Sequence, residues 1–372
     1  MEKKKILIVS RSFHPENSPR SFRTTELVKE LCRQGHDVTL YTIQNSEHQL
    51  PLVKQFGFTL KDLGKMRSPS FSPVKGDGRI SFLFKRVMKR VLLMLFEYPD
   101  IELMFKVKRV LKNESGYDML ISVAVPHPVH WGVAWARTKE HPIAKTWVGD
   151  CGDAYMGVIK HDSFEKFFYF KYLEKWFCRK ADVITIPHIQ MQVNYYPEFR
   201  HKIVEISQGF KFDEVQATNV EVKNPVPTFA FAGGFIRTTR NPGPLLDYLV
   251  STGRDFKFIA YTRTTDLLQP YKEKLGDKLE IRDYLPREKL IQVMAGMDFL
   301  VNIGFDPAQQ APSKLIDYYL SGRPILSLST NQPDPKIVDE FLNGNYTNGF
   351  KYPSMDRFKI ENVTAAFLQL CR

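Results

Sequence analysis

One segment in the C-terminal half, from Ala311 to Leu326, combines residue types whose spacing suits the binding of an anion. Pro312 and Ser313 are expected to begin a helix. The free N–H groups at its start attract negative charge, and Lys314 adds a cation in the first turn. Asp317 follows on the same side of the helix, where a carboxylate beside a phosphate can accept hydrogen bonds from ribose hydroxyls. The alternative is a capped surface helix that carries a Lys–Asp pair.

Glycines and arginines follow a predicted strand earlier in the same half. The strand at 228–232 ends at Gly233 and Gly234, and glycine lets the backbone approach a ligand closely. Arg237 and Arg240 lie in the loop that comes next. Ligands of open α/β sheets bind beyond the carboxyl ends of the strands, so this loop is a second candidate for an anion site. The alternative is a tight turn with two solvated arginines.

A third group of polar residues lies in the N-terminal half. His127 stands between two prolines, shortly after the predicted strand at 119–123. We expect it at the edge of a cleft, although a structural loop histidine has the same signature. His130 is expected to pack on a helix. Asp150 and Asp153 are candidates for binding the hydroxyls of a second substrate, or alternatively an N-cap and a turn residue.

The elements that must position these residues alternate between strand and helix. A continuous apolar run at 5–10 predicts a buried parallel strand, and helical spacing follows at 22–34. Gly35 then ends the helix before a second strand at 37–41, which completes a βαβ unit. Later strands are predicted at 119–123, 144–148, 183–186, 203–206, 228–232, 256–261, 279–282 and 299–303, and helices at 163–180, 290–297 and 313–321.

A polar segment with two prolines, residues 213–227, divides the chain and is the predicted linker. We therefore expect an N-terminal domain at 1–212 and a C-terminal domain at 228–354. The tail at 355–372 is expected to pack back on the N-terminal domain.

Several classes of protein are disfavoured. Neither glycine pattern is the dinucleotide fingerprint or a P-loop, and no Asp-x-Asp triplet suggests a metal-held diphosphate. The four cysteines, Cys32, Cys151, Cys178 and Cys371, are scattered, which disfavours a zinc site or a disulfide framework. We expect no metal and no cofactor. The sequence shows no signal peptide and no apolar stretch of membrane-spanning length, which predicts a cytoplasmic protein.

Four segments, in order, resemble the GT-B glycosyltransferases, and most closely the retaining family 4, especially its members that build bacterial surface polysaccharides. They are the first βαβ at 6–39, the Asp-containing loop at 147–153, the turn at 207–210, and the Pro-Ser-Lys helix at 312–326. The resemblance covers nearly the whole chain. It implies an α/β fold of two Rossmann-like doubly wound domains that face each other across a cleft. It also implies that the N-terminal domain, 1–212, binds the acceptor and that the C-terminal domain, 228–354, binds the nucleotide sugar.

The resemblance also implies roles for single residues. Asp317 matches the acidic residue that holds the nucleotide ribose, whereas the acidic residue that contacts the donor sugar is replaced by Gln309. Arg240 matches a diphosphate-binding lysine. The arginine that precedes it in the family falls on Phe235, so Arg237 is the expected substitute. In the family, the backbone of the segment that matches Tyr284 and Leu285 faces the base. The catalytic candidates are His127, Arg240 and Lys314. The predicted donor site comprises Gly233, Gly234, Arg237, Arg240, Tyr284, Leu285, Gln309, Ser313, Lys314 and Asp317.

The implied function is transfer of a sugar from a UDP- or GDP-linked donor to a glycan or a polyprenyl-linked glycan, in cell-surface polysaccharide synthesis. Two alternatives stay open. One is another enzyme on the same fold, such as a UDP-sugar 2-epimerase or a sugar phosphorylase. The other is a protein without activity: a basic scaffold or nucleic-acid binder, which the net charge of +12 would fit, or a degenerate transferase, which Gln309 would fit. We expect no nucleic-acid partner, because the basic residues recur at the ends of βα loops.

The segment at 79–96 predicts an amphipathic helix. Ile80, Leu83, Phe84 and Val87 fall on one side of it, and Lys85, Arg86, Lys89 and Arg90 fall on the other. This pattern is typical of a helix that lies in an anionic membrane interface, and it would place the enzyme on the inner face of the membrane. The alternative is a core helix with a solvated basic face.

Overall fold

The computed structural model describes residues 2–67, 78–157, 166–214, 221–304, 313–329, 334–351 and 354–371. Its contacts divide the chain into two compact units. The N-terminal unit comprises Met1–Phe210 together with Asp356–Arg372, and the C-terminal unit comprises Lys211–Met355. The segment 213–227 is thus grouped with the C-terminal unit, and its residues 215–220 lie outside the described part of the chain.

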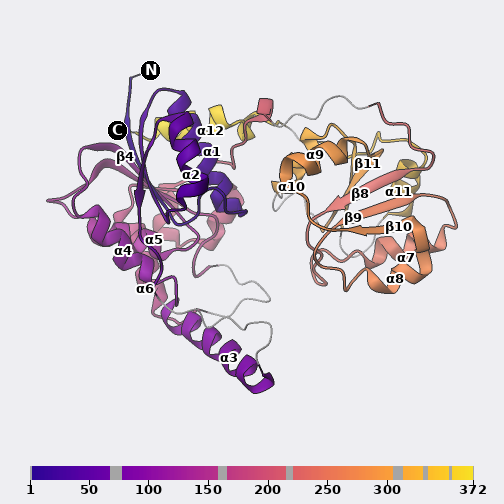
Figure 1. Ribbon diagram of the computed structural model, residues 1–372, viewed down its shortest axis with the longest axis horizontal. Coiled ribbons are helices and arrows are strands. Elements are labelled where there is room, and N and C mark those ends of the chain that lie inside the picture. Colours follow the sequence, from indigo (N-terminus) through magenta and orange to yellow (C-terminus); the bar gives the residue numbers. More distant parts are fainter. Residues whose placement is uncertain are drawn as a thin grey trace. The chain divides into compact units, whose positions relative to one another are not determined.

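The N-terminal unit is built on a seven-stranded parallel sheet in the order β3-β2-β1-β4-β5-β6-β7. Figure 1 shows the helices of this unit around the sheet. Its strands are β1 (Lys5–Ser10), β2 (Asp37–Thr42), β3 (Thr59–Asp62), β4 (Tyr117–Val123), β5 (Ala144–Asp150), β6 (Val183–Ile186) and β7 (Ile203–Glu205). Its helices are α1 (Pro19–Arg33), α2 (Ser46–Phe56), α3 (Arg79–Phe96), α4 (Glu102–Leu111), α5 (Pro128–Ala136), α6 (Phe170–Lys180) and α12 (Ile360–Gln369).

The C-terminal unit repeats this plan with five parallel strands in the order β10-β9-β8-β11-β12. Its strands are β8 (Thr228–Ala232), β9 (Lys257–Tyr261), β10 (Leu279–Arg282), β11 (Phe299–Ile303) and β12 (Ile325–Leu328). Its helices are α7 (Gly243–Ser251), α8 (Gln269–Leu275), α9 (Arg287–Ala295), α10 (Ser313–Leu320) and α11 (Pro335–Leu342). Two sheets with helices between their strands confirm the predicted pair of doubly wound α/β domains.

Local sequence explains how the first βαβ unit forms. The apolar residues of β1 are fully buried, because helices cover both faces of a parallel sheet. Ser18 caps α1 by accepting a hydrogen bond from the amide of Ser21 at 3.2 Å, and Pro19 begins the helix. Beyond its end, Gly35 adopts φ +85°, which glycine tolerates without strain.

The last helix of the chain, α12, completes the core of the N-terminal unit. Ile360, Val363 and Phe367 are buried in the cluster that also contains β1 and α1. Gln34 at the end of α1 donates a hydrogen bond to the Thr364 hydroxyl at 2.8 Å. The final segment therefore stabilises the same core as the first strand, from the other end of the sequence.

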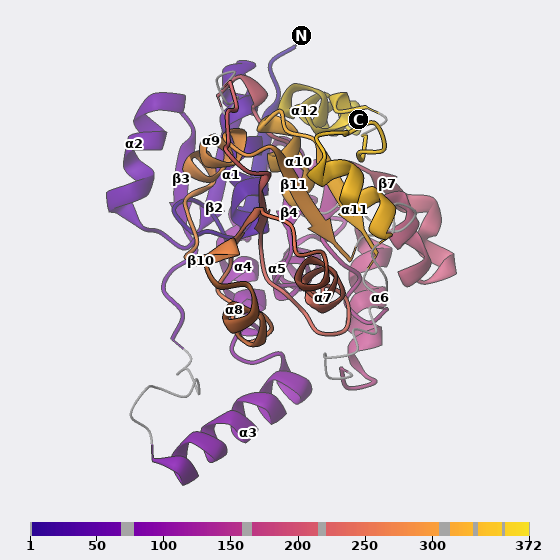
Figure 2. The same cartoon turned by 90° about the vertical axis from the view of Figure 1, so that its right-hand side faces the viewer.

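The helix α3 differs from the others of its unit. None of its described side chains is buried, and it extends away from the sheet of its own unit (Figure 2). The alternative of a core helix at 79–96 is therefore wrong. Within the described residues, no helix combines the length and the apolar character that a membrane span requires.

Candidate active site

Both sheets change direction at an equivalent place. Each begins at a central strand, winds to one edge, and then continues on the other side of that strand. The crossover falls between β1 and β4 in one unit and between β8 and β11 in the other. In open α/β sheets, the carboxyl ends of the strands at such a point form the usual ligand site, and most of the predicted residues follow these strands.

In the C-terminal unit, the loop after β8 folds back on itself. The amide of Arg240 donates to the carbonyl of Ile236 at 2.8 Å, and the amide of Phe235 donates to the Thr264 hydroxyl at 2.7 Å. Gly304, directly after β11, lies against this loop: a Cβ atom there would stand 1.7 Å from the carbonyl oxygen of Thr239. Only glycine fits this contact, which holds Arg240 at the ends of both central strands.

Lys314 lies beside this loop, in the first turn of α10. Its ammonium group is 4.4 Å from the centre of the Phe231 ring, and its Nζ atom is buried with no hydrogen-bond acceptor among the described residues. Burial, and then the charge of Arg240, lower the pKa of Lys314 to about 7. A buried cation without an acceptor is costly, so an anion bound here would supply the missing partner.

Tyr318 fixes the position of α10 relative to the sheet. Its hydroxyl accepts a hydrogen bond from the Ala232 amide at 2.8 Å and donates to the Val301 carbonyl at 3.2 Å. These two hydrogen bonds of the fully buried Tyr318 join α10 to the carboxyl ends of β8 and β11. Lys314 lies one turn before this anchor and Asp317 directly before it.

Asp317 has a cationic partner that its own helix does not supply. Its Oδ1 atom accepts a hydrogen bond from the Nε atom of Arg287 at 2.7 Å. Burial raises the pKa of the Asp317 carboxyl, and Arg287 opposes that shift. Arg287 begins α9 and was not among the predicted site residues. No local motif marks it, although it closely follows Tyr284 and Leu285.

The remaining donor-side candidates are less enclosed. Arg237 and Gly233 are exposed, whereas Gly234 and Leu285 are half-buried. Tyr284 is exposed, and the guanidinium group of Arg263 lies 5.1 Å from the centre of its ring. Ser313 is the first residue of α10, with its side chain outside the description, and Gln309 lies outside the described residues.

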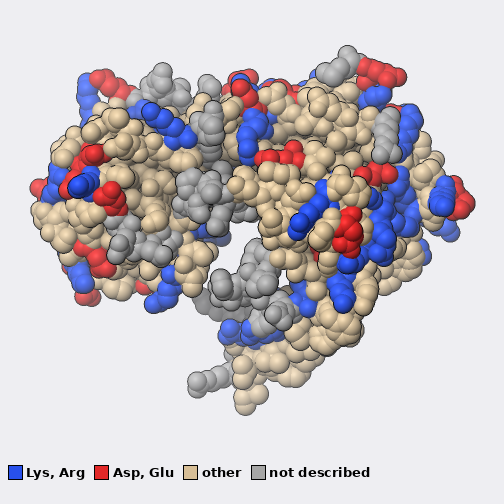
Figure 3. All heavy atoms as spheres, turned by 180° about the vertical axis from the view of Figure 1, so that it is seen from behind, with Lys and Arg blue, Asp and Glu red and all other residues tan. Residues whose placement is uncertain are grey.

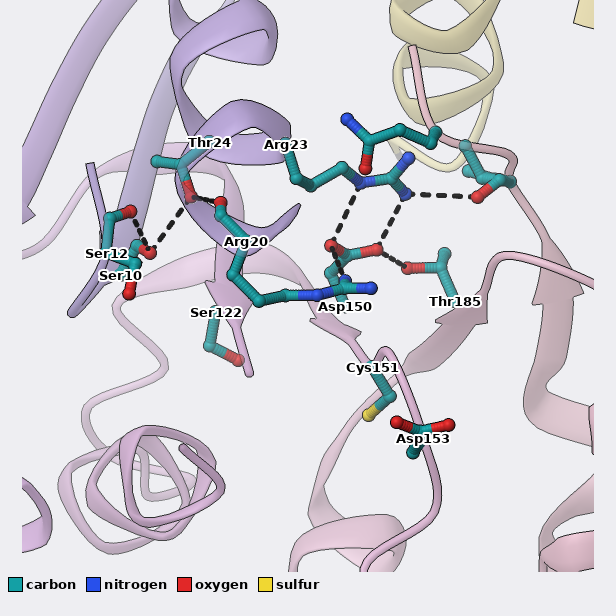
Figure 4. Close-up of polar contacts among 12 residues, drawn as sticks. Ser10, Ser12, Arg20, Arg23, Thr24, Ser122, Asp150, Cys151, Asp153 and Thr185 are labelled. Atoms are coloured by element: carbon teal, nitrogen blue, oxygen red, sulfur yellow. Dashed lines mark hydrogen bonds and ion pairs between the residues drawn. The ribbon is translucent and has the colours of Figure 1, made fainter. Parts of the chain in front are cut away.

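In the N-terminal unit, Asp150 at the end of β5 is the centre of a buried polar network (Figure 4). Its carboxylate accepts hydrogen bonds from Arg23 at 3.1 and 2.8 Å and from the Thr185 hydroxyl at 2.8 Å. Arg23 also donates to the carbonyls of Ile206 and Ser207. Burial acts to raise the pKa of Asp150, but the Arg23 guanidinium outweighs it and holds that pKa below its usual range. All these partners are internal, so Asp150 joins α1 to three strand ends.

A second arginine, Arg20, lies on the outer side of this network. Its guanidinium is 3.7 Å from the carboxylate of Asp150, and it fills the space where a Cβ of Gly152 would stand, 2.6 Å from the nearest nitrogen. Burial lowers the pKa of Arg20. The sequence interpretation missed both Arg20 and Arg23. Ser18 and Pro19 just before them mark a helix start and were the available signal.

His127 links the loop after β4 to the loop after β5. Its Nε2–H donates to the carbonyl of Asp153 at 3.2 Å, and its ring lies 5.0 Å from that of Tyr155. Burial lowers the pKa of His127 to about 4, so the ring is neutral near pH 7. His130 is fully buried, with Nδ1 2.8 Å from the Ser122 hydroxyl and its ring stacked on Phe177. The packing role expected for His130 is confirmed.

Within the described residues, no group of three or more His, Cys, Asp or Glu side chains is placed to hold a metal ion. The groups that the C-terminal unit brings together at its switch point are two cations, a helix start and a paired carboxylate.

Solved structures share this fold over nearly the whole chain. A glycosyltransferase from Rickettsia africae matches with a TM-score of 0.63 and 11% identity, covering 100% of this chain and 98% of that one. HepE from Anabaena, solved with UDP and glucose, matches with a TM-score of 0.59 and 10% identity over 98% of both chains. A UDP-N-acetylglucosamine 2-epimerase matches with a TM-score of 0.53 and 8% identity, covering 99% of this chain and 95% of that one.

The fold is thus that of the GT-B enzymes. No protein-family profile matches the sequence, and no curated protein matches it.

Proposed function

We propose that this protein is a glycosyltransferase that takes a nucleotide-diphosphate sugar in its C-terminal unit and passes the sugar to a glycan or lipid-linked glycan. The observation that carries the proposal is the buried amine of Lys314, which has no acceptor among the described residues and lies beside Arg240 at the switch point of the sheet. A diphosphate is the anion that fits two adjacent cations and a helix start.

In this proposal each residue has a separate task. Lys314 and Arg240 contact the diphosphate and stabilise the charge that develops on it when the bond to the sugar breaks. Asp317, paired with Arg287, accepts hydrogen bonds from the ribose hydroxyls. The acceptor hydroxyl forms the new bond to the sugar and loses its proton, and the nucleoside diphosphate leaves.

Several finer features belong to the same proposal. The order of the sequence motifs supports membership of the retaining family 4 and a place in cell-surface polysaccharide synthesis. HepE was solved with UDP and glucose, which supports UDP ahead of GDP as the donor nucleotide. We place the acceptor in the N-terminal unit, near His127, Arg20 and Asp153.

The lipid-linked form of the acceptor requires contact with a membrane. We propose that α3 provides this contact on the cytoplasmic face of an anionic bilayer. Ile80, Leu83, Phe84 and Val87 are all exposed along one stripe of the helix, and the helix contains basic residues but no acidic ones.

A binding panel tests the donor site. UDP-, GDP-, ADP- and CMP-sugars are compared by thermal shift, and the best is measured by calorimetry with wild type and Lys314→Met. We expect one of the UDP-, GDP- and ADP-sugars to stabilise wild type and to release its nucleoside diphosphate when an acceptor is added, whereas CMP-sugars, which carry a single phosphate, should not. Stabilisation by none of the four would contradict the proposed donor site.

The second candidate is an epimerase of the same fold, which the structural likeness to a UDP-N-acetylglucosamine 2-epimerase favours. Incubation with the nucleotide sugar alone separates the two candidates. An epimerase changes the sugar without an acceptor, whereas a transferase leaves it intact. Nucleotide-sugar binding without either reaction would indicate a degenerate binding protein, consistent with Gln309 in place of an acidic residue.

A further inference from the structure

The C-terminal end of α3 is attached to the body of its unit through a buried carboxylate. Glu97 follows the helix directly, in a left-handed conformation with φ 51° that glycine usually occupies at this position. Its carboxylate accepts a hydrogen bond from the Tyr155 hydroxyl at 2.7 Å and pairs with the ammonium group of Lys166. Glycine could not supply this carboxylate, which explains a non-glycine residue at the helix end.

This attachment brings a second exposed apolar element to the same end of α3. Phe96 precedes Glu97 and is 56% exposed, while Phe167 and Phe168 follow Lys166 and are 38% and 64% exposed. The ion pair between Glu97 and Lys166 therefore places these three rings on neighbouring segments.

A series of aromatic contacts connects Phe167 and Phe168 to the core of the unit. Their ring centres lie 5.7 Å apart, and both lie within 6 Å of Tyr169, at 5.5 and 5.9 Å. Tyr169 contacts Phe170 at 4.7 Å, and Phe170 is fully buried in the core. Two exposed rings on a rigid base resemble an anchor more than a solvated loop, because exposed apolar groups that gather in one place mark a contact surface.

The charged side chains that α3 itself contributes are all basic, among them Lys85, Arg86, Lys89 and Arg90. Lys171 follows the two rings in the sequence. Seen from behind, α3 forms a projection on which basic side chains are visible (Figure 3). A surface of exposed apolar groups and cations is complementary to an anionic bilayer, whose headgroups attract the cations while the rings enter the acyl boundary.

We infer that Phe167 and Phe168 form, together with α3, one lipid-binding surface in which the two rings anchor the C-terminal end of the helix. This inference rests on the proposed membrane contact of α3 and adds a second insertion point to it. Two attachment points on neighbouring segments would restrict the orientation of the N-terminal unit on the bilayer more than contact through the helix alone.

The test is partition of the full-length protein onto vesicles of phosphatidylcholine with phosphatidylglycerol. Phe167→Ser combined with Phe168→Ser should weaken partition roughly tenfold, since each partly inserted ring loses its transfer free energy. The matched control combines Leu50→Ser with Val193→Ser, two other exposed apolar residues of this unit, and should partition as wild type does. In addition, the fluorescence of the Phe168→Trp variant should be quenched by brominated acyl chains beyond the wild-type level, and that of Leu50→Trp should not.

Each outcome decides a separate point. If wild type binds and the double variant binds equally well, with no added quenching in the Phe168→Trp variant, the aromatic anchor is wrong while α3 stands as the contact. If wild type does not bind anionic vesicles at low salt, both the membrane contact and the anchor are wrong, and the donor site is unaffected. If the double substitution instead abolishes self-association in the absence of lipid, the surface binds a second copy, which also overturns the inference.

Discussion

The two units hold their buried cations in opposite ways. In the N-terminal unit, Arg23 is paired with Asp150 and with two backbone carbonyls, so its charge is compensated inside the protein. In the C-terminal unit, Lys314 is buried against Phe231, and the charged neighbour that acts on it, Arg240, has the same sign. Both cations lie near the carboxyl ends of the strands of a doubly wound sheet. A buried cation that is paired with groups of the protein belongs to the architecture of its unit. A buried cation without such a partner is a candidate for binding an anionic ligand.

The largest expected effect is on the stability of the N-terminal unit. Arg23→Met should lower the free energy of unfolding by about 3–5 kcal/mol, because it removes the hydrogen-bonded cation of the buried Asp150 carboxylate and leaves only the more distant Arg20. Urea denaturation measures the change. Lys145→Met in the same unit removes only an exposed pair with Asp118 and should cost less than about 1 kcal/mol. Equal stability of the two variants would mean that the buried pair is not a structural anchor.

Lys314→Met should affect ligand binding without lowering the stability of the fold. It removes a buried charge that has no acceptor among the described residues, so the stability of the free protein should stay the same or rise. Affinity for the nucleotide sugar should fall by about 1.5–3 kcal/mol, roughly 10- to 100-fold, through loss of a charge-assisted contact to the diphosphate. Calorimetry checks the affinity, with the exposed Lys289→Met on α9 as control. Lost stability together with unchanged affinity would reverse the comparison between the units.

The pH dependence of the C-terminal unit follows from the same amine. The pKa of Lys314 is lowered to about 7 in the folded protein, so below pH 7 the amine is already charged and affinity for a diphosphate is at its full value. Above pH 7 the amine must take up a proton on binding, so affinity should fall by up to about tenfold per pH unit. For the free protein, this site should raise stability with increasing pH between about 7 and 10.5, because the unfolded lysine binds the proton more tightly.

Calorimetry in two buffers of different ionisation enthalpy measures the proton uptake directly. A nucleotide sugar is the suitable probe, since its diphosphate remains fully ionised throughout this range. Lys314→Met should abolish both the proton uptake and the pH dependence above pH 7. A pH profile that survives this substitution would assign the titration to another group.

The smallest expected effects concern the ribose. Asp317→Ala should weaken binding by about 1–3 kcal/mol, and Arg287→Gln by about 1 kcal/mol, because each removes hydrogen bonds on which ribose recognition depends. Binding of a 2′,3′-dideoxyribonucleotide should be much less sensitive to both substitutions, since it lacks the hydroxyls that would donate to Asp317. Equal losses for the ribose and dideoxyribose ligands would show that the pair supports the fold of α9 and α10 and does not contact the ribose.

Much of the fold could be predicted because the signals for it are local. The strand predictions at 5–10, 183–186, 228–232, 279–282 and 299–303 coincide with β1, β6, β8, β10 and β11. Runs of apolar residues that are buried on both faces mark such strands within a few positions. The predicted helix at 163–180 was less accurate: α6 begins at Phe170, and residues 166–169 form the turn that carries the exposed rings.

The candidate site was predictable only in part. Lys314 and Asp317 could be found because they share one short helix, whose first turn binds anions for local reasons. Arg287 is 30 residues from Asp317 and Arg23 is 127 residues from Asp150, so no spacing in the sequence indicates either pair. The same limit applies to Glu97 and Lys166, whose ion pair joins two segments of the N-terminal unit.

The sequence by itself determined the alternation of strands and helices, the amphipathic character of α3, and the residue types at the ends of the central strands. These properties depend on the periodicity of neighbouring residues and on the steric preferences of glycine and proline. Only the tertiary structure decided which charges are paired, that Lys314 is buried without an acceptor from the described part of the chain, and that the apolar side of α3 is exposed. Desolvation and pairing depend on groups that are distant in the chain, and the packing of the sheets and helices alone determines where those groups meet.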